Sequence, residues 1–290
     1  MQRLVETRLP VDLALTLGPL RVAGRRDPCV AIGPAGVWRA SRWPSGPATM
    51  LLRSLSPTTV AVSAWGVGAA EALDTAPALV GADDTDGGLL TTDDRVVRAM
   101  ARSRPGLRIG RTGNVLEAVT PTIIAQKVPG HLAAQSFVAM VRAHGEPAPV
   151  PELAGAPRLL LPPTAEWLAA QPSWMWHRWG VEQRRASTVA RAARATAQLP
   201  TVPGVGAWTV AKVAAAAYGD PDAVSVGDYW LKHWVCHTLA GEPRGTDERM
   251  LELLAPWAGQ RGRVCRLIMV AGARLPRYGP RLVVPDIRAL

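Results

Sequence analysis

The sequence predicts an α+β fold: a small antiparallel β-sheet domain, residues 1–88, followed by a mostly helical domain, residues 89–290. Three observations give this division. Short β-favouring segments alternate with Gly, Pro and Ser turns up to about residue 80. The acidic, glycine-containing stretch 83–88 is typical of a surface linker, and helical patterns follow it. With 290 residues, 48% of them hydrophobic, the chain has enough apolar material for two packed cores.

The first domain begins with residues 11–17, where apolar side chains at alternate positions predict a half-buried strand. Gly18-Pro19 ends that segment. Further strands are expected at 29–32, 36–40, 48–53 and 59–65, with a helix at 67–79. These elements predict a small α+β unit that a helix closes.

The second domain is expected to be helical at 95–103, 114–124, 132–144, 246–254 and 261–274. Asn114, with Glu117 three residues further on, has the spacing of a capping box. Residues 146–163 are rich in proline and are expected to form a connector draped over the surface. Four tryptophans crowd residues 167–179, which favours core packing between helices; stacking on nucleic-acid bases is the alternative.

The most specific pattern is LPTVPGVGA at 199–207. Pro200 and Pro203 cannot continue a helix, and Gly204 and Gly206 allow a tight turn before a second helix begins at Ala207. The N–H groups of Gly204, Gly206 and Ala207 are then expected at a helix N-terminus, where the partial positive charge favours a phosphate. The sequence therefore predicts a helix-hairpin-helix that binds the backbone of a nucleic acid.

Asp228 stands about twenty residues past the hairpin, in VSVGD, directly before a helical pattern at 229–239. By position alone the carboxylate is best explained as a helix N-cap. Its pairing with the hairpin favours a chemical role instead, because the combination is known from one group of enzymes.

A hairpin of the form L-P-x-V-P-G-V-G followed by an aspartate in V-S-V-G-D resembles the helix-hairpin-helix DNA glycosylases, in particular the AlkA-like 3-methyladenine glycosylases. The resemblance covers most of the chain, since the predicted N-terminal sheet is similar to that of the family. It implies base excision repair: a damaged base is flipped from duplex DNA into a pocket and its glycosidic bond is hydrolysed. It also implies that Asp228 stabilises the cationic sugar, that Trp208 offers a face to the base, and that Met269 lines the pocket.

The resemblance also implies roles for other residues. The turn at Gln126 and Lys127 corresponds to one that enters the minor groove, although Lys127 stands where the family carries an apolar wedge. The carbonyls of Pro200, Val202 and Val205 correspond to ligands of a monovalent cation, Na⁺ or K⁺. Relatives that also cut the strand carry a lysine at the position of Trp208, so a monofunctional hydrolase is implied. Lys212 replaces a tyrosine of the family; lyase chemistry, phosphate binding and a solvent-facing position remain alternatives for it.

The composition fits this interpretation. The net charge of +10 indicates a polyanionic partner, although an arginine-rich composition can equally reflect genomic base composition. Cys29, Cys236 and Cys265 are far apart, so neither a disulfide framework nor an iron–sulfur cluster is expected, and a reducing cytoplasm fits. The sequence shows no signal peptide and no apolar run of about twenty residues. A soluble monomer that acts on double-stranded DNA, without a membrane partner, is expected.

Two functions from different classes remain at this point. The first is a glycosylase that removes alkylated purines, or another damaged base of the deaminated or oxidised kind, with Asp228 catalytic. The second is a non-catalytic protein that uses the hairpin only to bind DNA. In the second case Asp228 is merely a cap.

Overall fold

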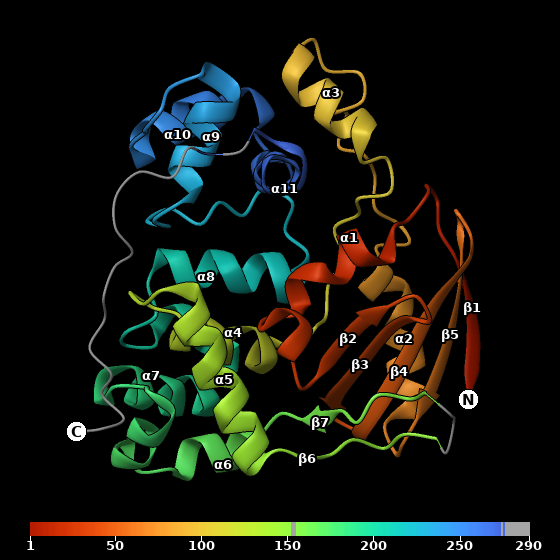
Figure 1. Cartoon of the computed structure of the whole chain (residues 1–290), viewed down its shortest axis with the longest axis vertical. Helices are drawn as coiled ribbons and strands as arrows, with labels where there is room; N and C mark the ends of the chain where they lie inside the picture. The colour runs from red at the N-terminus through yellow and green to blue at the C-terminus, as the bar shows by residue number, and fades with distance from the viewer. Residues whose placement is uncertain (152–154, 274, 276–290) are drawn as a thin grey trace.

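The computed structural model of the chain describes residues 1–151, 155–273 and 275. It contains an antiparallel sheet beside a larger group of helices (Figure 1). The strands are β1 Gln2–Glu6, β2 Val30–Gly33, β3 Gly36–Trp43, β4 Gly46–Ser56, β5 Thr59–Trp65, and the short pair β6 Glu146–Pro147 and β7 Leu160–Leu161. The helices are α1 Leu13–Leu17, α2 Ala69–Val80, α3 Arg95–Ser103, α4 Val115–Ile124, α5 Gly130–His144, α6 Ala165–Ala170, α7 Gln183–Arg194, α8 Ala207–Val213, α9 Leu231–Ala240, α10 Asp247–Leu254 and α11 Arg261–Ala271.

The sheet has the order β1-β5-β4-β3-β2, and every neighbouring pair is antiparallel. Side chains alternate between its two faces, as strand geometry requires. On β4, Met50 and Leu52 lie in one core together with α1 and α2, whereas Leu51 lies on the other face with Trp38. The α+β class and the strands predicted at 29–65 are confirmed, and β1 is an additional strand.

Residues 11–17 do not form the predicted strand. Asp12 accepts a hydrogen bond from the N–H of Leu15 at 2.9 Å and caps α1. Leu13, Thr16 and Leu17 are the buried residues of this helix, which is the i, i+3, i+4 spacing of a helix face. In a segment of only seven residues, apolar side chains at alternate positions are compatible with the two-residue period of a strand and with the 3.6-residue period of a helix. The cap by Asp12 favours the helix.

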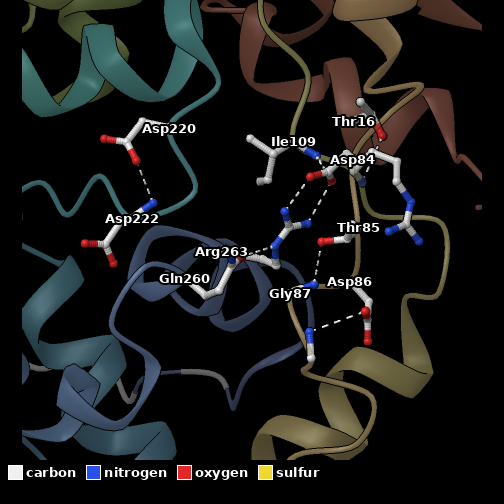
Figure 2. Close-up of polar contacts among 12 residues, drawn as sticks. Thr16, Asp84, Thr85, Asp86, Gly87, Ile109, Asp220, Asp222, Gln260 and Arg263 are labelled. Carbon is white, nitrogen blue, oxygen red and sulfur yellow. Dashed lines mark hydrogen bonds and ion pairs between the residues drawn. The ribbon is translucent and has the colours of Figure 1, made fainter. Parts of the chain in front are cut away.

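The acidic stretch 83–88 is more than a surface linker. The Asp84 carboxylate accepts hydrogen bonds from Arg263 of α11, at 2.6 and 2.9 Å, and from the N–H of Ile109, at 2.8 Å (Figure 2). The Arg263 side chain is only 3% exposed and that of Asp84 14%. Asp84 therefore ties the segment after the sheet to α11 by a buried ion pair.

The connector at 146–163 carries β6 and β7, which pair with each other. Its residues Ala148, Leu159 and Leu161 are buried against Trp38 and Leu51 of the sheet. The connector thus covers the face of the sheet opposite α2. Within the described part of it, the segment is a layer of the fold as well as a surface link.

The helices form two cores. One extends from the sheet into α4, α5, α7 and α8, and contains Trp176 and Trp179, so the prediction that the tryptophan cluster is core packing is confirmed for these two. Trp174 is instead exposed. The other core is formed by α3, α9, α10 and α11. Among the described residues, no helix combines the length and apolar character needed to cross a bilayer.

Glu117 of α4 connects the sheet to the helices beside it. Asn114 caps α4 as predicted, by accepting a hydrogen bond from the N–H of Glu117. The Glu117 side chain does not complete the capping box. It pairs with Arg39 of β3 at 2.8 Å and accepts a hydrogen bond from the Ser41 hydroxyl. Glu117 thus fixes the first turn of α4 to the sheet.

All three cysteines are buried and unpaired with one another. Burial raises the pKa of each thiol, well above the ordinary value at Cys29 and to about 12 at Cys265. These thiols therefore act as small apolar core residues.

Candidate active site

A hairpin joins the short 3₁₀ helix Thr196–Thr201 to α8, as the sequence predicts. Gly204 has a φ of +93°, and a Cβ at that position would lie 2.5 Å from the hydroxyl oxygen of Thr188 on α7. Only glycine meets both conditions without strain. Gly206 is the N-cap of α8 and offers no side chain to the helix, so the first-turn N–H groups of α8 point out of the hairpin without a side-chain cap.

The turn after α4 is fastened to this hairpin. The Gln126 side-chain amide donates hydrogen bonds to the carbonyl oxygen of Gly204, at 3.0 Å, and to the hydroxyl oxygen of Thr209, at 2.9 Å. The next residue, Lys127, is exposed and has a φ of +56°; it is the only non-glycine residue with positive φ in the described part of the chain. The structure therefore brings Gln126, Lys127 and the hairpin together. Gln126 links the turn after α4 to the hairpin, and Lys127 lies exposed at the tip of that turn.

Asp228 lies beside the first turn of α8. One of its oxygens, Oδ1, accepts hydrogen bonds from the N–H groups of Trp230, at 3.0 Å, and Leu231, at 3.1 Å, at the start of α9. The other, Oδ2, accepts a hydrogen bond from the Trp208 indole at 3.2 Å and lies 3.7 Å from the Lys212 ammonium. Oδ1 of Asp228 therefore binds the start of α9, while Oδ2 of the same carboxylate faces Trp208 and Lys212.

This environment keeps Asp228 ionised. Burial alone raises the pKa of the carboxyl, but the charge of Lys212, the N–H groups of Trp230 and Leu231, and the Trp208 indole all lower it. The net pKa lies below the ordinary value of 3.8. A carboxylate that is partly buried and still charged at neutral pH is suited to stabilising a positive charge that develops next to it.

Trp208 and Lys212 are four residues apart on α8 and therefore share one face of the helix. The Lys212 nitrogen lies 5.8 Å from the centroid of the Trp208 ring. With Asp228 they form a cluster that we call the α8 triad. The structure therefore brings Trp208, Lys212 and Asp228 together, and their role as a base pocket stays a prediction.

A large cleft, of about 2940 Å³, contains the α8 triad. Met269 of α11 lines the same cleft and is half exposed, and Gln126 and Lys127 lie along it as well. The cleft is large enough to admit a group the size of a nucleobase. The predicted site residues, which lie after α4, in α8, before α9 and in α11, all line this cleft.

Some supporting residues had no signal in the sequence. Arg191 of α7 donates a hydrogen bond to the carbonyl oxygen of Pro203, at 3.2 Å, and Thr209 is buried under the hairpin as a partner of Gln126. Arg185 is buried and donates to the carbonyl oxygen of Ile124 at the end of α4. Each of these side chains binds a segment that is distant in the sequence. A local sequence pattern cannot predict such a contact.

The three carbonyls expected to hold a cation belong to the hairpin. The Val202 carbonyl oxygen already accepts the N–H of Val205 at 3.0 Å. Among the described residues, no backbone N–H donates to the carbonyls of Pro200 or Val205. Carbonyl oxygens with free lone pairs are the ligand type that hard cations prefer, so the donor set fits such an ion.

Comparison of the sequence with protein-family models finds no match, and comparison with curated proteins also finds none. Comparison of the structure finds similar solved chains. A 3-methyladenine DNA glycosylase from Archaeoglobus fulgidus is 17% identical, with a TM-score of 0.76, over 92% of this chain and 97% of that one. An 8-oxoguanine glycosylase/lyase from Clostridium acetobutylicum is 12% identical, with a TM-score of 0.69, over 92% and 95%. The same enzyme in complex with double-stranded DNA is also similar, with a TM-score of 0.67, 11% identity and 92% and 96% of the chains covered. At these identities the comparisons show a shared fold.

Proposed function

We propose that this chain, which has the fold of the DNA glycosylases to which it is similar, is itself a monofunctional DNA glycosylase of base excision repair. The observation that carries the proposal is the ionised Asp228 carboxylate, held between the indole of Trp208 and the start of α9 and facing the cleft. The fold places a hairpin with uncapped N–H groups next to it. A binding module needs the hairpin alone, whereas hydrolysis needs the carboxylate as well.

The proposed reaction is hydrolysis of an N-glycosidic bond. As the bond between C1′ and the base breaks, positive charge develops on the sugar, and Asp228 stabilises it electrostatically and orients the attacking water. The leaving base takes the electron pair, water adds at C1′, and an abasic site remains. Trp208 offers an aromatic face on which a positively charged purine is held.

Alkylated purines of the 3-methyladenine and 7-methylguanine type are the proposed substrates, in duplex DNA. Such bases are cationic in the nucleotide and leave readily, so they demand little of the enzyme beyond base flipping and the carboxylate. The half-exposed Met269 supplies an apolar surface in the same cleft. The similar fold of the Archaeoglobus fulgidus 3-methyladenine DNA glycosylase supports this choice.

The hairpin is proposed to hold the DNA backbone. Its N–H groups at Gly204, Gly206 and Ala207 bind a phosphate, and a monovalent cation held by the carbonyls of Pro200, Val202 and Val205 adds positive charge there. Lys127, at the tip of the neighbouring turn, faces the same DNA. A basic net charge of +10 favours this partner.

The test is single-turnover release of 7-methylguanine or 3-methyladenine from alkylated duplex by wild type and Asp228→Asn. Asparagine keeps the acceptor for the N–H groups of Trp230 and Leu231, so folding and DNA affinity are expected to change little. Removal of the charge is expected to slow base release by about a hundredfold or more.

Equal rates for the two proteins, with equal melting temperatures, would remove Asp228 from the mechanism. If neither protein releases a base and both bind duplex DNA, the non-catalytic DNA-binding alternative is correct instead. The melting temperatures separate a chemical effect from an unfolding effect.

A further inference from the structure

Two aromatic side chains directly after Asp228 are exposed in the cleft. Tyr229 is 68% exposed and Trp230 is 51% exposed, and both line the cleft that contains the α8 triad. Trp174 and Tyr218 are exposed to a similar extent, but neither of them lines this cleft. Adjacent exposed aromatic side chains beside a cleft are typical of a binding surface. We call Tyr229 and Trp230 the aromatic pair.

The aromatic pair is fixed at the start of α9. Oδ1 of Asp228 accepts a hydrogen bond from the Trp230 N–H at 3.0 Å, which ties the backbone of the pair to the carboxylate. The two rings of the pair lie 4.9 Å apart between centroids, at an interplanar angle of 85°. The Tyr229 ring also lies 6.2 Å from that of His233, at 88°. A perpendicular contact covers at most one face of a ring, so the half-exposed Trp230 keeps a flat face open for another aromatic group.

Positive charge surrounds the aromatic pair. Burial lowers the pKa of His233, and the charges of Lys232 and Arg244 lower it further, so both cations lie near the ring that Tyr229 contacts. Lys232 pairs with Asp247 at 3.4 Å, whereas Arg244 is exposed and makes no ion pair with any described residue. An open aromatic face next to such a cation is suited to a nucleic-acid strand, with a base on the ring and a phosphate on the cation.

Extrusion of one nucleotide from a duplex leaves the neighbouring bases with unstacked faces. The cost falls when the protein supplies a flat apolar surface to a base that has lost its neighbour. Lys127, at the tip of the turn after α4, is charged and supplies no such surface. Consecutive nucleotides of a strand are about 3.4 Å apart along the axis, and consecutive Cα atoms about 3.8 Å. A ring one or two residues after Asp228 is therefore within reach of a base next to the sugar on which Asp228 acts.

We propose that Trp230, supported by Tyr229, stacks on the base that flanks the extruded nucleotide on the same strand. The inference rests on the proposed function, since it requires that a nucleotide leaves the stack. Trp208 and the aromatic pair then bind different bases: Trp208 binds the extruded base, and Trp230 binds its neighbour in the strand. Tyr229 and Trp230 are thus positioning residues that stabilise the opened duplex and do not touch the reacting bond.

The experiment measures binding by fluorescence anisotropy to a duplex that carries a tetrahydrofuran abasic analogue in place of the damaged nucleotide. No base can enter the pocket from this duplex, while its flanking bases can stack on the protein. Trp230→Ala is expected to raise the Kd for this duplex about tenfold or more. The Kd for an intact, undamaged duplex is expected to stay within about twofold of wild type, because the bases there remain stacked on one another.

Two further duplexes lack, in addition, the base on the 5′ side or on the 3′ side of the analogue. When the base that stacks on Trp230 is missing, wild type and Trp230→Ala are expected to bind with equal Kd. With the base on the other side missing, the difference between the two proteins is expected to persist. This coupling identifies the stacked base and separates stacking from a contact with the backbone.

Trp174→Ala is the matched control, because Trp174 is an exposed tryptophan outside the cleft, and its Kd values are expected to equal those of wild type. Substitution of Trp230 keeps the backbone N–H that binds Asp228, so the melting temperature is expected to stay close to the wild-type value. Trp230→Phe keeps an aromatic ring and is expected to retain most of the affinity. It keeps the experiment informative if the alanine variant is unstable.

Equal Kd values of wild type and Trp230→Ala on the abasic duplex would overturn the inference. An equal loss on the intact duplex would also overturn it, because a general surface contact predicts that result, and so would the absence of coupling to either flanking base. Base release tests the proposed function separately. Wild type that releases no base from alkylated duplex would overturn that function, and the binding series would still decide whether Trp230 stacks.

Discussion

The two explanations of Asp228, a residue that binds the start of a helix and a residue with a chemical role, are compatible with each other. Its Oδ1 caps α9 through two N–H groups, and its Oδ2 faces Trp208 and Lys212. The cap fixes the orientation of the carboxylate, and this fixed orientation is what electrostatic stabilisation requires. The cap is therefore part of the site.

The ionisation of Asp228 gives a prediction about pH. Its folded-state pKa lies below the ordinary value of 3.8, so the carboxylate stabilises the folded protein above that value, and the contribution is lost as pH falls through the folded pKa. Lys212 is the largest of the contributions that lower this pKa. In Lys212→Met the pKa of Asp228 is expected to rise, and the acid limb of 7-methylguanine release is expected to shift to higher pH. Rate profiles between about pH 3 and pH 8, corrected for acid depurination and limited to pH values at which both proteins are folded, measure the shift; superimposable acid limbs would contradict it.

Lys212 also bears on strand cleavage. Schiff-base chemistry needs a lysine amine that is free to attack the sugar, and the Lys212 nitrogen lies instead 3.7 Å from the Asp228 carboxylate. The resemblance of the hairpin sequence implies that Trp208 stands where strand-cutting glycosylases carry a lysine. Treatment with borohydride during reaction with damaged duplex is therefore expected to trap no covalent adduct. An adduct that disappears in Lys212→Ala would reverse this conclusion.

At the scale of elements, the hairpin depends on Gly204 and much less on Gly206. Valine at 204 would combine a φ of +93° with a contact against Thr188, which costs about 1–3 kcal/mol. Gly204→Val is expected to weaken binding to damaged and undamaged duplexes alike, because the proposed contacts of the hairpin are with the DNA backbone only. Fluorescence anisotropy with both duplexes measures this.

The matched variant is Gly206→Ala. Gly206 has a negative φ of −101°, and a Cβ there meets no atom within 4 Å, so the melting temperature is expected to stay at the wild-type value. A variant of Gly204 that bound undamaged duplex normally and lost only the preference for damage would show that the hairpin reads the lesion.

The elements differ in how far the sequence could predict them. The hairpin and α9 were predicted because prolines, glycines and an aspartate act locally on the backbone. Residues 11–17 were predicted wrongly, since the alternating pattern of a seven-residue segment is compatible with a helix that Asp12 caps. The tie between Gln126 and the hairpin could not be predicted, because its partners are 78 and 83 residues away in the chain. The same holds for Asp84 and Arg263, which are 179 residues apart.

At the scale of the molecule, that last pair is expected to contribute strongly to stability. Asp84→Asn leaves the Arg263 guanidinium buried without a counter-charge, which costs about 3 kcal/mol or more. Asp83→Asn is the control, because the Asp83 carboxylate is exposed and makes no ion pair with any described residue. Urea unfolding of both variants measures the difference. Equal midpoints would mean that the contact between the linker and α11 contributes nothing to the free energy of unfolding.

The burial of the three cysteines matters for the survival of the protein in a damaged cell. Methylating agents and oxidants that modify purines also attack sulfur, and they react with the thiolate far faster than with the thiol. With every cysteine buried and the pKa of every thiol raised, the chain offers such electrophiles almost no thiolate. A protein built in this way is expected to keep its thiols unmodified under the same chemical exposure that damages purines.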